Sequence, residues 1–145
     1  MNVRPSALII KRDRILTLRY NYGDKDVYAL PGGNPDAGEC LHEALKRELD
    51  EELGVITDVN EMIICGEVIW KEIQKETFHV VFETKIFGTP ALNPAHTTAL
   101  EIVWLPIDAL NGKVLYPNIG RQIEDFCEQL FTFVHIGVIE QPYIR

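Results

Sequence analysis

The chain has 145 residues, of which 46% are hydrophobic and 25% charged, a balance that excludes a disordered or membrane-embedded protein. Its 14 basic and 22 acidic residues give a formal net charge of −8, which repels the phosphate backbone of duplex nucleic acid at long range. The length predicts a single domain over residues 1–145, large enough to fold without a disulfide or a structural metal.

The three cysteines are odd in number and include no CxxC pair. This usage predicts neither a disulfide framework nor a zinc site and favours a reducing cytoplasm. The apolar run near the N-terminus is shorter than a signal-peptide core, and no run approaches the ~20 residues of a membrane span. We therefore expect a cytoplasmic protein without a membrane partner.

The N-terminal part of the chain predicts a β-hairpin. Two runs rich in β-formers, Ala7–Ile10 and Ile15–Leu18, flank a charged turn at residues 11–14. A polar loop then leads to a short strand at residues 27–30. The Pro-Gly-Gly run at residues 31–33 interrupts regular structure directly after it.

The segment from Cys40 to Leu53 is predicted as a helix, because it lacks glycine and proline and ends at Gly54, a natural C-cap. At 100° per residue, four leucines share one face and form a buried stripe. They are Leu41, Leu45, Leu49 and Leu53. Glu52 lies within the angular range of this stripe, and Glu48 and Glu51 flank it.

Three further strands are predicted downstream, at residues 61–70, 78–87 and 102–105. A short helical turn is expected at residues 106–110 and a second helix at residues 118–133. Strands dispersed among two helices predict an α/β (α+β) fold, in which helices cover both faces of a mixed sheet.

The carboxylates beside the leucine stripe need a positive partner. Glu48 and Glu52 are like charges at i,i+4, and a desolvated carboxylate is costly unless it is paired or bound to a metal. Arg47 can reach Glu51, but one guanidinium cannot serve three carboxylates on both sides. Mg²⁺ or Mn²⁺ prefers such oxygen ligands and is therefore the candidate cofactor. The helix alone is also compatible with an ordinary charged surface.

Residues 33–55 fit the pattern G-x5-E-x7-R-E-U-x-E-E-x-G-U, with U an aliphatic residue, at every fixed position. The fixed positions are Gly33, Glu39, Arg47, Glu48, Leu49, Glu51, Glu52, Gly54 and Val55. This stretch resembles the signature of the Nudix hydrolases, and the flanking runs YALPGG and EIVWLPIDAL look like the strands around it. The likeness extends from about Ala7 to Phe126 and implies a Nudix-type αβα sandwich.

The resemblance also implies an activity: metal-dependent hydrolysis of the pyrophosphate bond of a nucleoside diphosphate derivative, by attack of water on phosphorus. Its metal ligands would be the carbonyl of Gly33 and the carboxylates of Glu48, Glu51 and Glu52. Glu51 and Glu52 would be the principal ligands, and Glu48 would be either a further ligand or the base that orients the attacking water. Arg47 would brace a catalytic glutamate. Because some relatives take the base from a downstream loop or strand, Glu101 and Glu83 are alternative bases.

For substrate binding, Arg19 resembles a phosphate-contacting arginine of relatives, Gly32 permits a tight turn, and Trp70 could stack on a base. Trp70 stands where ADP-ribose hydrolases carry a proline, and no tyrosine follows as in dinucleoside polyphosphate hydrolases. A small nucleotide, such as a canonical or damaged nucleoside triphosphate, remains by elimination. The alternative is a non-catalytic nucleotide-binding or regulatory module, and a homodimer is left open.

Overall fold

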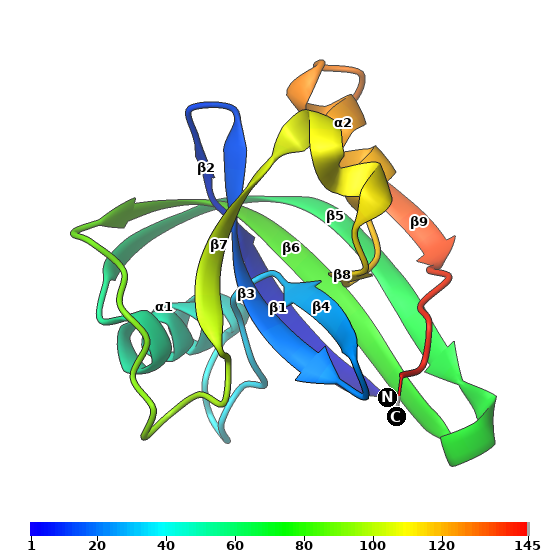
Figure 1. Ribbon diagram of the computed structural model, residues 1–145, viewed down its shortest axis with the longest axis horizontal. Coiled ribbons are helices and arrows are strands. Elements are labelled where there is room, and N and C mark those ends of the chain that lie inside the picture. The colour runs from blue at the N-terminus through cyan, green and yellow to red at the C-terminus, as the bar shows by residue number, and fades with distance from the viewer. Residues whose placement is uncertain (145) are drawn as a thin grey trace.

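The strands form two mixed β-sheets in the computed structural model, which describes residues 1–144 (Figure 1). One sheet has the order β1-β6-β5-β9, and the other has the order β2-β3-β4-β8 with β7 paired to β3. The strands are β1 (Asn2–Leu8), β2 (Ile10–Lys11), β3 (Arg14–Tyr22), β4 (Lys25–Ala29), β5 (Ile56–Trp70), β6 (Lys75–Phe87), β7 (Glu101–Pro106), β8 (Leu115–Tyr116) and β9 (Val134–Val138). The helices are α1 (Leu41–Leu53) and α2 (Gly120–Cys127), with short 3₁₀ helices η1 (Lys71–Ile73) and η2 (Ile107–Gly112).

The predicted N-terminal hairpin is confirmed in β2 and β3, where Lys11 pairs with Arg14. The strand predicted over Ala7–Ile10, however, is divided between the two sheets. Its first part belongs to β1, which is parallel to β6, and the chain changes sheet at Ile9. Ala7, Leu8 and Ile9 are all buried, so the sequence carries no in-out alternation that would reveal the change.

Helix α1 confirms the predicted helix to within one residue at its N-terminal end. Three of the four leucines in the predicted stripe, Leu45, Leu49 and Leu53, are fully buried, whereas Leu41 in the first turn is only partly buried. They pack against side chains of β1, β3 and β6. Gly54 adopts a left-handed φ of 66°, and its N–H donates to the carbonyl of Asp50 at 2.9 Å. The glycine C-cap is therefore present as predicted.

The second helix is shorter than predicted. It ends at Cys127, and Gln129 takes a left-handed φ of 62°. The N–H of Leu130 donates to the carbonyl of Asp125 at 3.0 Å, which closes the helix end in the manner of a Schellman motif. The helix prediction over residues 128–133 was wrong, because a glutamine holds the position at which a glycine would have signalled the end.

The helices lie on opposite sides of the strands (Figure 1), and each contributes to a separate hydrophobic core. The α1 leucines belong to one core, and Ile123 of α2 packs in the other with Leu110 of η2. This arrangement confirms the predicted α+β fold class. The short β8 and β9 were not predicted. No helix in residues 1–144 is both long and apolar enough to cross a membrane.

Candidate active site

The glycines before α1 lie where the loop after β4 pairs with β1. Ser6 and Gly32 form an isolated antiparallel bridge, and the N–H of Gly33 donates to the carbonyl of Pro5 at 3.2 Å. A Cβ on Gly32 would collide with the Pro5 carbonyl, whereas a Cβ on Gly33 would lie 2.6 and 2.7 Å from the carboxylate oxygens of Glu48. The backbone of Gly33 therefore rests directly against the Glu48 carboxylate.

Arg47 organises the acidic side chains around the start of α1. Its Nε donates to Glu39 at 2.8 Å, and its Nη1 donates to Glu48 at 3.2 Å and to Glu51 at 3.1 Å. Its Nη2 also donates to the carbonyl of Asn34 at 3.2 Å. The hydrogen bonds to Glu39 raise the pKa of Arg47 and lower that of Glu39. Arg47 thus ties the loop before the helix to two of its carboxylates.

Glu52 is left outside this network. Within residues 1–144, neither a hydrogen bond nor an ion pair reaches its carboxylate, which is half-buried. Burial and the nearby charge of Glu48 raise the pKa of Glu52 to about 7. Burial also raises the pKa of Glu48, although Arg47 opposes that rise. Two carboxylates therefore lie close together at the core's edge with too little positive charge to compensate them.

A divalent cation matches this donor set. No three acidic, histidine or cysteine side chains of residues 1–144 already converge on one point, because Arg47 holds Glu48 and Glu51 while Glu52 stands apart. The oxygen chemistry still fits, since Mg²⁺ and Mn²⁺ favour carboxylate and carbonyl ligands and retain waters. The uncompensated Glu52 and the close approach of Gly33 to Glu48 are the observations that support the fit.

An aromatic hollow, lined by Arg4, lies near these carboxylates. Two adjoining cavities, of about 420 and 490 Å³, share Arg4, Trp70 and Tyr116 in their walls. Gly33 lines the second of them, and the stacked rings of Tyr20 and Tyr22, 6.3 Å apart, line the first. Aromatic walls of this kind suit a planar ring.

Arg4 connects the hollow to the carboxylates. Its guanidinium lies 5.1 Å from the centre of the Tyr116 ring, and its Nη2 donates to the carbonyl of Leu30 at 3.1 Å. Its Nη1 is buried and has no hydrogen-bond partner among the described residues. Burial lowers the pKa of Arg4, whereas the charges of Glu48 and Glu52 raise it. A buried cationic donor without a partner can receive an anionic or carbonyl oxygen of a ligand.

His79 lies beside Arg4 and is held neutral. Its ring meets Tyr116 edge-on at 4.9 Å, and neither ring nitrogen has a hydrogen-bond partner in the described part of the chain. Burial, together with the charge of Arg4, lowers the pKa of His79 to about 3.

The connection between β6 and β7, residues 88–100, borders the C-terminal half of α1. The N–H of Ala91 donates to the carbonyl of Leu53 at 3.0 Å, and the N–H of Asn93 donates to that of Glu52 at 2.9 Å. His96 Nδ1 lies 3.9 Å from Glu51. This connection therefore encloses the exposed side of the acidic cluster.

The remaining predicted site residues lie in other surroundings. Arg19 donates to Glu101 at 2.9 Å and to Asp26 at 3.2 Å, so these charges neutralise one another. Glu83 follows Phe82 of the α1-side core, so the alternation of β6 turns it to the opposite face. Trp70 does line the aromatic hollow, and its Nε1 donates to the carbonyl of Gln141 at 3.0 Å.

Arg4, Tyr116 and His96 were not identified from the sequence. Arg4 did carry a signal, because it directly precedes the buried run Pro5–Leu8 of β1, where a charge is unexpected. Tyr116 and His96 carried none, since both reach the site through long-range contacts.

Comparison with known proteins places this geometry in a family context. Residues 2–126 match the family described as NUDIX domain. A curated ADP-ribose pyrophosphatase of Methanocaldococcus jannaschii is 39% identical over 87 residues, which are 59% of this chain and 52% of that protein. The chain thus spans about half the length of that relative.

Solved structures show the same fold. The E. coli ORF135 protein has a TM-score of 0.73 at 21% identity, over 90% of this chain and 91% of its own. A Mutator MutT protein from Bacillus halodurans has a TM-score of 0.75 at 16% identity, over 100% and 94%. An ADP-ribose pyrophosphatase from Streptococcus suis has a TM-score of 0.67 at 17% identity, over 96% and 98%. At these identities the likeness demonstrates shared architecture.

Proposed function

The chain belongs to the NUDIX domain family, and from that premise we propose that it hydrolyses the pyrophosphate bond of a nucleoside diphosphate derivative with Mg²⁺ or Mn²⁺. The observation that carries the proposal is the half-buried Glu52 carboxylate, which has no hydrogen-bond or ion-pair partner among residues 1–144 and whose pKa is raised to about 7 by burial and by Glu48. Such a site is unfavourable in a merely structural helix and favourable where a cation binds. Glu48, Glu51, Glu52 and the carbonyl of Gly33 would hold the ion.

A bound divalent ion would supply Lewis-acid stabilisation of the phosphate oxygens. In the reaction, the oxygen of water bonds to phosphorus while the anhydride P–O bond breaks, and the water loses a proton. Glu48 accepts this proton, because burial raises its pKa and makes it a better base. Arg47 keeps Glu48 in place through its hydrogen bond of 3.2 Å. Glu101 is exposed and paired with Arg19, whereas Glu48 is half-buried beside Gly33 in the acidic cluster, which favours Glu48 over that alternative base.

For the substrate, we propose a small nucleotide whose base enters the aromatic hollow. Trp70 and Tyr116 offer stacking surfaces, and Nη1 of Arg4, which has no hydrogen-bond partner in the described residues, offers a donor in the wall of the hollow. A canonical or damaged nucleoside triphosphate is the leading substrate. ADP-ribose is the second candidate, because the M. jannaschii relative at 39% identity is described as an ADP-ribose pyrophosphatase.

The test is a screen of nucleoside triphosphates and ADP-ribose with Mg²⁺, in which the released products are separated by chromatography. We expect hydrolysis by the wild type and a loss on the order of 10³-fold in Glu52→Gln. Asp50→Asn is the matched control, because Asp50 is an exposed carboxylate on the same helix. It should retain the wild-type rate.

Two outcomes would contradict the proposal. Equal rates for wild type and Glu52→Gln would exclude a catalytic role for this cluster. Tight nucleotide binding without product release would favour the non-catalytic nucleotide-binding or regulatory module. Which candidate is cleaved faster decides between the triphosphate and ADP-ribose.

We further propose a reducing, cytoplasmic setting. Cys40, Cys65 and Cys127 are all free thiols, and Cys65 is buried. A fold that leaves its thiols unpaired is suited to a compartment where thiols stay reduced.

A further inference from the structure

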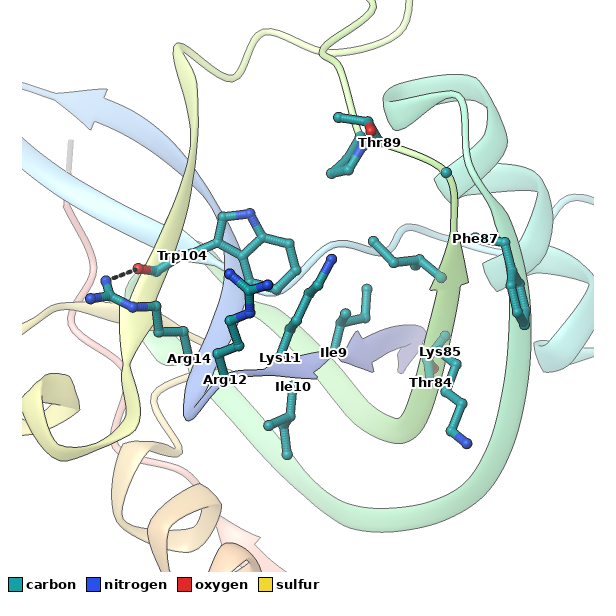
Figure 2. A pocket seen from close by; sticks show the side chains of 13 residues that line it. Ile9, Ile10, Lys11, Arg12, Arg14, Thr84, Lys85, Phe87, Thr89 and Trp104 are labelled. Carbon is teal, nitrogen blue, oxygen red and sulfur yellow. Dashed lines mark hydrogen bonds between the residues drawn. The ribbon is translucent and has the colours of Figure 1, made fainter.

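A further cavity lies just beyond the C-terminal end of β1, where the chain enters the β2–β3 hairpin (Figure 2). Its volume is about 620 Å³, which exceeds that of either hollow beside Arg4, and it shares no lining residue with them. The β2–β3 hairpin, the end of β6 and Trp104 of β7 form its walls. It is therefore separate from the proposed active site.

The cavity is strongly cationic. Lys11, Arg12, Arg14 and Lys85 line it, and no acidic residue does. The chain has only 14 basic residues and a net charge of −8, so this group of residues forms a locally positive surface on a negatively charged protein. Within residues 1–144, none of the four cations has an ion pair, and Arg14 donates only to the carbonyl of Trp104, at 3.4 Å. These charges are therefore available to an anion.

Two of the cationic side chains in the β2–β3 hairpin point toward the cavity. Lys11 and Arg12 extend toward the space beside Trp104, whereas Lys85 points away from it (Figure 2). Arg12 occupies the turn with a left-handed φ of 53°. Glycine or asparagine is favoured at such turn positions, and an arginine there carries a conformational cost. Formation of the turn therefore does not explain why an arginine occupies this position.

The remaining wall is apolar and aromatic. Ile9 is buried in the floor, the indole of Trp104 forms one side, and Phe87 is 58% exposed at the rim. A ring of a ligand could stack on an indole while its charged group meets the cations. The volume is within the range of small-molecule sites. The net charge of −8 opposes the approach of a nucleic-acid polymer.

We propose that this cavity is a second binding site, for a small phosphate ester that carries a planar ring, such as a nucleoside monophosphate. Lys11 and Arg12 bind the phosphate, and Trp104 stacks on the ring. Binding at this site does not require hydrolysis. A binding experiment can therefore disprove this proposal without bearing on the proposed hydrolytic function, and a hydrolysis assay can disprove the function without bearing on this site.

The two tryptophans make the test specific to the site. Trp104 lines the cationic cavity, and Trp70 lines the hollow beside Arg4. Their indole N–H signals can be followed by ¹⁵N NMR, with Trp70→Phe used for assignment. Adenosine monophosphate is titrated in the presence of EDTA, and adenosine and inorganic phosphate are titrated separately. We expect a saturable shift of the Trp104 signal, with adenosine monophosphate binding at least tenfold more tightly than either fragment.

The variant Lys11→Gln with Arg12→Gly removes the two aimed cations, which are both exposed, and glycine suits the left-handed turn. It should weaken binding at Trp104 at least tenfold and leave the response of Trp70 unchanged. Lys25→Gln with Arg121→Gln removes the same charge from exposed positions outside both sites and should bind as the wild type does. Equal affinity in the Lys11 and Arg12 variant, no saturable Trp104 shift, or equal affinity for inorganic phosphate would overturn the proposal.

Discussion

Gly32 and Gly33 are adjacent in the chain, but a side chain at each would meet a different obstacle. At Gly32 the obstacle is backbone, the carbonyl of Pro5 and the Cα of Ser6, the latter at 2.7 Å. At Gly33 it is the end of the Glu48 side chain, with oxygens at 2.6 and 2.7 Å. The paired backbone of Pro5 and Ser6 cannot move aside, whereas the Glu48 carboxylate can rotate away.

We therefore predict opposite consequences for two alanine substitutions. Gly32→Ala should lower the free energy of unfolding by more than about 2 kcal/mol, because the added Cβ forces the loop away from the backbone of β1 at the Ser6 bridge. Gly33→Ala should change stability little but reduce hydrolysis at least tenfold, since Glu48 is displaced. Denaturant unfolding and the hydrolysis assay measure the two effects. An unstable Gly33→Ala with normal turnover when folded would contradict this assignment.

The acidic residues of the candidate site were predicted from the sequence, whereas Arg4, the cation near them, was not. Glu48, Glu51 and Glu52 lie on one helix, where spacing fixes their relative angles. Arg4 of β1 and Tyr116 of β8 are distant in the chain and belong to different sheets, and they meet only because the two sheets pack against each other. No local pattern reports such long-range pairing.

The two helices end in the same way but with different residues. Gly54 closes α1 at a φ of 66°, and Gln129 closes the end of α2 at 62°. A left-handed residue with a Cβ carries a cost that glycine avoids. The end of α1 was predictable from its glycine, and the end of α2 was not. For the same reason, no residue pattern indicated that a strand, β9, follows this helix.

Gln129→Gly should therefore stabilise the protein, by about 0.5 to 1 kcal/mol. Gly54→Ala, at the corresponding end of α1, should destabilise it by a similar amount. Both changes can be measured as shifts of the denaturation midpoint at constant m-value. A loss of stability in Gln129→Gly would show that the glutamine side chain makes a compensating contribution.

The molecule as a whole encloses a histidine between its two sheets. His79 of β6 faces Tyr116 of β8, is fully buried, and has a pKa lowered to about 3. The unfolded chain, with an ordinary histidine pKa near 6.5, binds a proton at this residue where the folded protein does not. The stability associated with neutral His79 is thus complete above pH 6.5 and is lost progressively as the pH falls toward 3.

We predict that unfolding becomes easier by roughly 1 kcal/mol for each pH unit below 6.5 because of this residue alone. His79→Gln should flatten the slope of stability against pH between 6.5 and 4. His42→Gln, at an exposed position on α1, should retain the wild-type slope. Identical slopes in all three proteins would mean that His79 is protonated in the folded state or that its surroundings admit water.

The irregular connection between β6 and β7 has a further consequence for the whole molecule. Its amides at Ala91 and Asn93 are bound to the last turn of α1, and that of Leu100 donates to the carbonyl of Arg19 at 2.8 Å. Conformational entropy in this stretch is therefore lost when the chain folds. A ligand that binds beside Glu51 therefore contacts a connection that is already ordered. The free energy of binding need not include the cost of ordering this segment.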